Sequence, residues 1–209
     1  MICLQVEVPF TSFRKPYARN FLETEDVPPI STCYGFLLSF VGEVDRRRHI
    51  GARVTTGLIR DPNISKILCK RWRHKNAKES LGNGQNRIVD YQYVLSNGIF
   101  AIVLDSSDES KLPTLEERFL EAYNHPERVN RFGTLCLGEN RHIVESVKIV
   151  QPSEVENMRL FAAYDTGKLC LSVWPDYRTN LRTVWINGDL VSVNTEPDRE
   201  TMPMIVENT

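Results

Sequence analysis

The sequence contains few of the side chains from which catalytic and metal sites are usually built. Among its 209 residues there are four His, and its five Cys stand at positions 3, 33, 69, 136 and 170 without a CxxC or Cys/His pair. This spacing excludes the usual zinc motifs and a disulfide framework, and it indicates reduced thiols in a cytoplasmic protein. GxSxG and Cys/His motifs are also missing, so we expect no catalytic residue, no metal site and no cofactor.

An excess of charge of one sign is missing too, as are long apolar runs. The formal net charge is −1, so any basic binding site must be local. No apolar run reaches the roughly 18 residues that a membrane span needs, and the N-terminal segment MICLQVEVPF lacks the basic region of a signal peptide. We therefore expect a protein without membrane contact.

Clear periodicity is present at the start of the chain. Residues 2–10 alternate between apolar and polar side chains, which indicates a strand with one buried face. An apolar stripe from Ile30 to Val41 predicts a helix, and the hydroxyl of Ser31 is well suited to be its N-cap.

A second helix and several strands follow. Thr114 and Glu117 have the spacing of a capping box, and Pro126 ends the helix that they begin. Asn97–Gly98 predicts a two-residue turn between two strands. The predicted strands of this part of the chain are 49–59, 88–95, 99–105 and 143–150.

This order of elements predicts an α+β fold. Residues 1–150 form the βαββαβ order of a ferredoxin-like domain, which is the arrangement of RNA-recognition (RRM-like) folds. Residues 151–196 predict a small C-terminal antiparallel β domain of two hairpins, which turn at 165–167 and at Asn187–Gly188. Residues 197–209 are predicted to be a flexible tail.

One insertion, residues 60–87, has a strong local charge. It carries eight Lys and Arg residues against Asp61 and Glu79, with Trp72 and His74 among the cations. Cations with an interleaved aromatic can neutralise phosphates and stack a base. The alternative is a solvated surface loop whose Trp72 packs back onto the domain.

A second basic cluster, SFRKPYAR at 12–19, leads toward the predicted helix start at Ser31–Thr32. No acidic residue stands in the first turn of that helix, and a helix N-terminus with free amides binds phosphate. The segment therefore predicts a phosphate site. The alternative is a plain N-cap that needs no ligand.

These residues lie within a longer recognisable pattern. The segment PFTSFRKPYARNFLETEDVPPISTCYGFLLSFVGE, residues 9–43, resembles the signature of the CRISPR-associated Cas five family, a RAMP-type subunit of type I Cascade complexes. LCLGENRHIVESVKIV near 135–150 resembles the family's second signature, although GENRH departs from its usual Gly-Arg-x-Glu pattern. The length and spacing resemble the DevS-like branch.

The resemblance implies a ferredoxin-like domain with a protruding β-hairpin thumb, here residues 60–96. It also implies a non-catalytic subunit of an antiviral ribonucleoprotein that caps the 5′ handle of the guide RNA. Its partners would be the guide RNA, the Cascade backbone subunit and the large subunit, with target DNA contacted only indirectly. The RNA-binding residues that we expect are Ser12, Phe13, Arg14, Lys15, Arg19, Ser31, Thr32, Lys66, Lys70, Arg71, Trp72, Arg73, His74, Lys75, Lys78, Arg87, Asn140 and Arg141.

Two other functions stay open at this point. One branch of the family is a metal-independent endoribonuclease with a Tyr/Lys/His-type site, which processes the CRISPR RNA precursor. That set does not fit this sequence, because Tyr34 stands in the first turn of the helix, Phe40 near its end, and no Lys-His pair occurs. An RNA-binding domain unrelated to CRISPR is the third possibility.

Overall fold

The computed structural model describes residues 1–209 apart from 17, 19–20, 180 and 208–209. Within this part of the chain the helices are α1 (Ile30–Phe40) and α2 (Leu115–Asn124). The strands are β1 (Ile2–Thr11), β2 (Phe13–Arg14), β3 (Phe21–Leu22), β4 (Thr24–Glu25), β5 (Arg53–Arg60), β6 (Asn63–Trp72), β7 (Arg87–Asp105), β8 (Ser146–Val150), β9 (Arg159–Ala163), β10 (Leu169–Trp174) and β11 (Val184–Ser192). The predicted α+β class is confirmed, and so is the capping box of α2.

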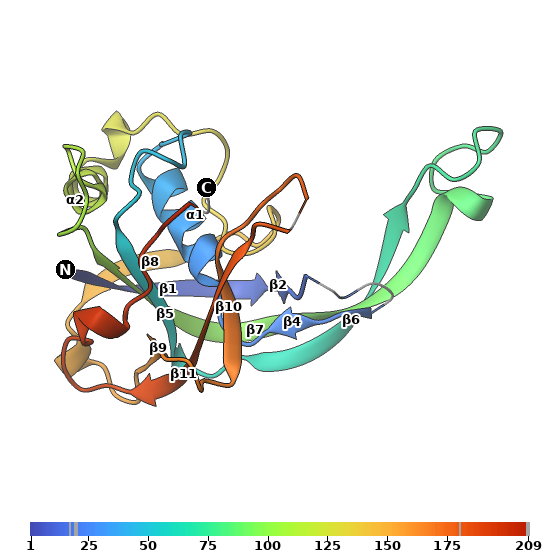
Figure 1. The fold of residues 1–209 in the computed structure, drawn as a ribbon. Coiled ribbons are helices and arrows are strands. Elements are labelled where there is room, and N and C mark those ends of the chain that lie inside the picture. The colour runs from blue at the N-terminus through green and yellow to red at the C-terminus, as the bar shows by residue number, and fades with distance from the viewer. Residues whose placement is uncertain (17, 19–20, 180, 208–209) are drawn as a thin grey trace.

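Among the described residues, nine strands form one mostly antiparallel sheet (Figure 1). Its order is β10-β11-β9-β5-β7-β1-β8, and β3 and β6 pair with β7 outside this path. β1 lies between β7 and β8 and is antiparallel to both, while β5 is antiparallel to β7. The short strands β2 and β4 form a separate pair.

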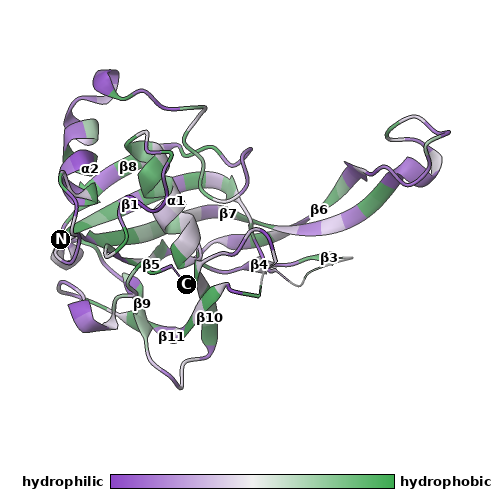
Figure 2. Cartoon of the chain, turned by 45° about the horizontal axis from the view of Figure 1, so that its top comes forward, coloured by the Kyte–Doolittle hydropathy of each residue, from purple (hydrophilic) through white to green (hydrophobic). Residues whose placement is uncertain are grey.

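Both faces of the sheet are covered. On one face, every second side chain of β1, such as Leu4 and Val6, belongs to the core that α1 and α2 cover. Phe40 of α1 stacks on Phe119 of α2 with ring centroids 4.3 Å apart. A smaller apolar cluster lies apart from this core and contains Cys3, Val103, Met158, Leu160 and Met202. Figure 2 shows the resulting hydrophobic colour along α1 and the central strands.

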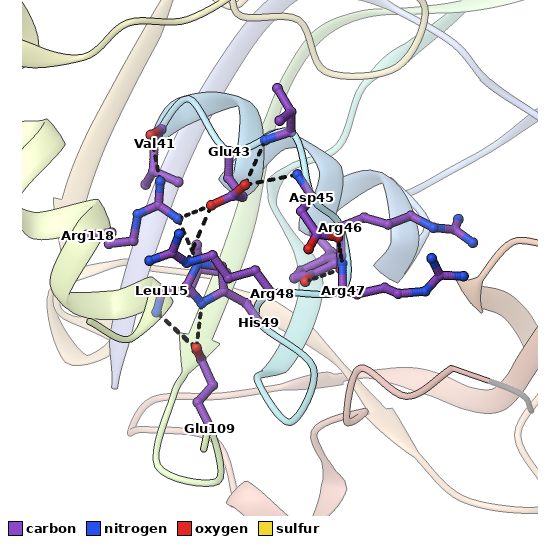
Figure 3. Close-up of polar contacts among 12 residues, drawn as sticks. Val41, Glu43, Asp45, Arg46, Arg47, Arg48, His49, Glu109, Leu115 and Arg118 are labelled. Atoms are coloured by element: carbon purple, nitrogen blue, oxygen red, sulfur yellow. Dashed lines mark hydrogen bonds and ion pairs between the residues drawn. The ribbon is translucent and has the colours of Figure 1, made fainter. Parts of the chain in front are cut away.

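A buried polar cluster joins the end of α1 to the start of α2 (Figure 3). His49 is fully buried, its Nδ1 lies 2.6 Å from Glu109 Oε2, and Arg118 Nη1 lies 3.0 Å from its Nε2. Because Arg118 can only donate, Nε2 is the acceptor and Nδ1 carries the proton shared with Glu109. The same Glu109 carboxylate accepts the Leu115 amide at 3.1 Å, and Arg118 pairs with Glu43.

The turn predicted at Asn97–Gly98 is wrong. β7 runs without interruption from Arg87 to Asp105, and Gly98 lies opposite Val8 of β1. Asn97 has a φ of 60°, and the register between β5 and β7 shifts between Leu58 and Arg60. The extra residue of this bulge is Ile59 on β5, whereas β7 stays in register with β1 through Asn97 and Gly98 and so continues without a reversal.

The two hairpins predicted in the C-terminal part are also wrong. β9 and β10 both pair with β11, and Asn187–Gly188 lies inside β11. A Cβ atom at Gly188 would lie 2.2 Å from the Ala162 carbonyl oxygen, so this glycine permits close strand contact where a turn was expected. Because Gly57 of β5 pairs with Leu160 of β9, these strands continue the main sheet and do not form a separate one. The division into domains at residue 150 stays a prediction.

The C-terminal segment is not the flexible tail that the sequence predicts. Met202 and Ile205 are 2% and 0% exposed. The Ile205 amide donates to the Ala52 carbonyl at 2.8 Å, and Arg199 Nε donates to Asp105 at 2.9 Å. Burial of two apolar side chains, together with these contacts, fixes the segment on the body.

β6 and the first part of β7 form a hairpin that extends far from the body (Figure 1). Its register runs from Asn63 opposite Ser96 to Trp72 opposite Arg87. We call residues 63–96 the arm. Because direct partners in an antiparallel pair share a face, this register decides which side chains lie together on the arm.

Candidate nucleic-acid interface

The arm carries most of the exposed cations predicted from the sequence. One of the set, Arg71, differs, because it forms an ion pair with Asp90, which is 6% exposed. A cation already paired with a buried carboxylate is poorly placed to bind a phosphate. The predicted RNA-binding residues of the arm that are exposed are Lys66, Lys70, Trp72, Arg73, His74, Lys75, Lys78 and Arg87.

One face of the arm is apolar as well as basic. Leu68, Val89 and Tyr91 are 62%, 48% and 50% exposed, and Lys66 Nζ lies 4.8 Å from the centroid of the Tyr91 ring. Trp72 shares this face and is 67% exposed. Its ring contacts the arm's own tip, where a Cβ at Gly82 would lie 2.7 Å from Trp72 Nε1. Trp72 therefore does not pack back onto the body.

The tip of the arm is organised by one buried amide. Asn86 Oδ1 accepts the amides of Lys75 and Asn76, both at 2.7 Å, and its Nδ2 donates to the carbonyls of Asn76 and Glu79, also at 2.7 Å. Asn86 is 0% exposed. These bonds hold the basic tip in a defined shape, which the glycines of the sequence did not indicate.

A polar contact joins the base of the arm to the loop before β8. Arg141 Nη2 donates to Gln92 Oε1 at 2.7 Å and lies 2.9 Å from Glu139 Oε2. Gln92 Nε2 in turn donates to Glu139 at 2.6 Å. Asn140 is exposed beside them, so the structure brings both predicted residues of this loop to the arm's base.

His142 fixes this loop against the segment after β1. Its Nδ1 accepts the Ser12 amide at 3.2 Å and the Glu139 amide at 3.0 Å. Two donors at one ring nitrogen require that nitrogen to be unprotonated. Burial lowers the pKa of His142, which agrees with a neutral ring.

The start of α1 differs from the prediction. The N-cap is Pro29, and no side chain of the described residues caps the helix. The φ of Pro29, −55°, is compatible with a helix, but its ψ of 151° is extended, so the first helical residue is Ile30. Ser31 Oγ instead lies 2.7 Å from Ser172 Oγ on β10. The first turn contains no acidic residue, as the sequence indicates.

A cavity of about 280 Å³ opens beside this helix start, and we call it the α1 pocket. The predicted residues that line it are Ser12, Phe13, Arg14 and Thr32. The Ser12 side chain is 1% exposed and its Oγ has no hydrogen-bond partner among the described residues. Arg14 is exposed and donates through Nη2 to the Ala18 carbonyl at 3.1 Å.

Two predicted residues of this cluster fare differently. Phe13 is 3% exposed and packs edge-on against Phe100 with centroids 5.4 Å apart, so its ring belongs to the core and cannot stack on RNA. Lys15 is half-buried and pairs through its amide with Glu23. Arg19 lies outside the described residues.

Other lining residues were missed at the sequence level. Ser172, Thr183 and Trp185 come from the C-terminal strands or the loop between them, and Glu25 comes from β4. No local pattern marks them, because only contacts between segments far apart in the sequence bring them to the start of α1. Burial raises the pKa of Glu25, an effect that Lys15 opposes and that Asp26 and Glu23 reinforce.

Comparisons with known proteins agree with the sequence signature. The family model described as CRISPR-associated protein (Cas_Cas5) matches residues 1–205. The chain is 38% identical over 207 residues to a CRISPR-associated protein Cas5 of Myxococcus xanthus (strain DK1622), covering 98% of this chain and 97% of that protein. The chain belongs to the CRISPR-associated Cas5 family. The resemblance inferred from residues 9–43 is thereby confirmed.

The fold of this Cas5-family chain also resembles solved structures. One, titled "CRISPR RNA-guided surveillance complex", aligns with a TM-score of 0.64 at 13% identity and covers 96% of this chain and 95% of the other. Another, titled "Crystal structure of Cas protein", aligns with a TM-score of 0.52 at 14% identity over 97% of both chains. The likeness of fold covers almost the whole chain.

Neither a membrane-spanning helix nor a cluster of metal ligands occurs within the described part of this Cas5-family chain. No helix there is long and apolar enough to cross a membrane. No three His, Cys, Asp or Glu side chains of these residues gather so that they could hold a metal ion.

Proposed function

We propose that this Cas5-family chain is a non-catalytic RNA-binding subunit of a type I Cascade complex that caps the 5′ handle of the guide RNA. The main support for this proposal is the charge of the arm. In a chain of formal net charge −1, this one projecting hairpin carries seven Lys and Arg residues against only Glu79 and Asp90. Such a cluster binds phosphates through charge and counterion release, and the exposed Trp72 offers a face for a base.

The topology supports the finer assignment of the fold. The strand order β8-β1-β7-β5 is that of a ferredoxin-like βαββαβ domain. Contacts from both helices to one apolar core fit the same domain. The arm connects β5 to the core part of β7, the second and third core strands along the chain, where the family's thumb is expected.

The exposed apolar residues of the arm favour a protein neighbour in addition to RNA. Leu68 and Tyr91 would be covered in an assembly, which fits contacts with the Cascade backbone subunit and the large subunit. Target DNA would then be reached only through these partners. We propose a cytoplasmic antiviral ribonucleoprotein as the setting.

The endoribonuclease alternative gains no specific support. Tyr34 is 4% exposed, its hydroxyl donates to the Arg46 carbonyl at 2.7 Å, and burial raises its pKa. His49 and His142 are both buried and hydrogen-bonded. Incubating the purified chain with repeat RNA in the absence of metal separates the two functions. Binding without cleavage supports the cap, and a specific cut would establish the nuclease.

Arg14→Ala should weaken binding of an RNA with the native 5′ handle by about 1.5–3 kcal/mol, the usual contribution of a hydrogen bond to a charged group. The melting temperature should not change, because Arg14 is exposed and donates only to the Ala18 carbonyl among the described residues. Filter binding with handle-bearing and handle-deleted RNA measures the difference.

Arg128→Ala is the matched control for Arg14. It removes the same charge from an exposed position beyond α2. The control should leave both affinities unchanged. An equal loss on both RNAs in Arg14→Ala would show that Arg14 belongs to a diffuse basic field, and the handle site at the α1 pocket would be abandoned.

Glu25→Gln should strengthen RNA binding, because the carboxylate lines the same pocket as Arg14 and repels a phosphate. Burial raises the pKa of Glu25, so the carboxyl becomes neutral at a higher pH than an ordinary Glu. Affinity of the unmodified chain should therefore rise as the pH falls through that pKa, and Glu25→Gln should remove this part of the pH dependence. Titrations at several pH values, with Glu127→Gln as the control, test this. Parallel profiles of Glu25→Gln and the unmodified chain would contradict it.

A further inference from the structure

A second basic pocket is lined by residues that directly follow or precede, in sequence, two residues of the α1 pocket. Its volume is about 350 Å³, and Arg46, Arg47, Arg178 and Arg182 line it together with Tyr177. We call it the arginine pocket. None of these residues belongs to the arm or to the N-terminal basic cluster. Figure 3 shows Arg46 and Arg47 pointing away from the His49–Glu109 cluster.

Arg46 is held in place between two aromatic rings. Its guanidinium carbon lies 4.1 Å from the centroid of Trp174 and 4.8 Å from that of Tyr177. Nη1 also donates to the Pro175 carbonyl at 3.0 Å. Stacking and this hydrogen bond fix the guanidinium without neutralising it, so its charge remains available.

The acids beside the pocket are already engaged. Glu207 makes a two-bond pair with Arg47, both bonds at 2.7 Å. Asp176 accepts the Arg178 amide at 2.9 Å and the Thr179 hydroxyl, so its carboxylate stabilises its own loop. Among the described residues, Arg46, Arg178 and Arg182 have no carboxylate within salt-bridge distance. The pocket therefore keeps a net positive charge.

The chain connects the two pockets directly. Pro175 and Thr183 line the α1 pocket, whereas Asp176 and Arg182, their neighbours in sequence, line the arginine pocket. Tyr177 contacts Arg46 and is 79% exposed. A phosphate matches the free guanidinium groups, and a base matches an exposed aromatic ring. An acidic peptide would use the charges but not the ring.

We propose that the arginine pocket binds one nucleotide of the single-stranded RNA that leaves the α1 pocket, with its phosphate on Arg178 and Arg182 and its base on Tyr177. This inference rests on the proposed RNA-binding function. It adds a site that the handle signature of residues 9–43 does not contain, and it extends the RNA path from the α1 pocket to Tyr177, Arg178 and Arg182.

The test measures binding of fluorescent handle-bearing RNA to the full chain. Arg178→Ala with Arg182→Ala should lower affinity tenfold or more, and it should reduce the slope of log K against log salt by roughly 1.4, which is two contacts at about 0.7 each. Arg178→Lys with Arg182→Lys should keep the slope but lose part of the affinity, because Lys cannot make the two-bond contact. Tyr177→Ala should lower affinity about 5- to 150-fold, the range for one base–aromatic stack. Tyr177→Phe should not.

The control removes two exposed cations elsewhere, Lys111→Ala with Arg128→Ala. If the unmodified chain binds RNA and the arginine variant matches this control, the arginine pocket is overturned and the proposed function stands. If the unmodified chain binds no RNA, both proposals fall. If the arginine variant keeps RNA affinity but loses binding of poly-glutamate, the pocket is a site for acidic protein and the nucleotide proposal is wrong. All the substituted side chains are exposed, so melting temperatures should agree.

Discussion

Glu109→Ala should lower the free energy of unfolding by about 3–5 kcal/mol, the cost of removing one partner from a buried charged network. The Glu109 side chain is 1% exposed. It accepts bonds from His49 Nδ1, the Leu115 amide and the Ser106 hydroxyl. Its loss would leave a buried imidazole N–H and a helix-start amide without acceptors.

Urea denaturation followed by circular dichroism gives this free energy directly. Glu127→Ala, on the surface just beyond α2, is the control and should change it by less than about 0.5 kcal/mol. Glu109→Gln should lie between the two, because an amide oxygen can still accept from Leu115. A loss below about 1 kcal/mol in Glu109→Ala would show that water replaces the carboxylate, and the cluster would not be what joins α1 to α2.

Replacing Lys70, Arg73, Lys75 and Lys78 together by Ala should reduce the salt dependence of RNA binding more than any other surface change in the chain. Each phosphate contact contributes about 0.7 to the log–log slope for a single strand, so four contacts correspond to a reduction of roughly 3. Arg71 is left out because Asp90 already pairs with it. Affinity measured over a range of salt concentrations gives the slope.

The comparison variant removes Lys111, Arg128, Lys148 and Lys168, four exposed cations outside the arm. It changes the net charge equally, so a difference in slope reports position and not total charge. Identical slopes for the two variants would contradict an RNA contact at the arm. Neither variant should be less stable by more than about 0.5 kcal/mol per site.

Local signals in the sequence were sufficient where an element depends on its own residues. Thr114 and Glu117 form the predicted capping box, because both bonds close within one helical turn. The alternation of residues 2–10 likewise becomes β1, since one face of it is buried. The same reasoning failed at Asn97–Gly98 and Asn187–Gly188, where neighbouring strands on both sides convert a turn signal into continuous backbone.

Contacts between distant residues decide most of the candidate sites. Ser31 is a residue type that often caps helices, yet its hydroxyl forms a hydrogen bond with the hydroxyl of Ser172 on β10. That contact depends on where β10 lies in the sheet, which the local sequence does not indicate. Phe13 looks like an RNA-stacking ring until Phe100 covers it. Net charge found the arm correctly but could not show that Asp90 neutralises Arg71.

Because β7 is continuous, the position of each arm residue along the strand decides which face of the arm its side chain lies on. Successive residues of a strand face opposite sides, so Val89 and Tyr91 lie on the apolar, basic face while Asp90 and Gln92 lie on the other. Deleting one residue from this stretch would exchange the two faces along everything beyond it, although deleting two would keep them. The arm can therefore become longer or shorter without exchanging its faces only in steps of two residues per strand. The number of residues in β7 thus sets both how far the arm extends and which side chains lie on each of its faces.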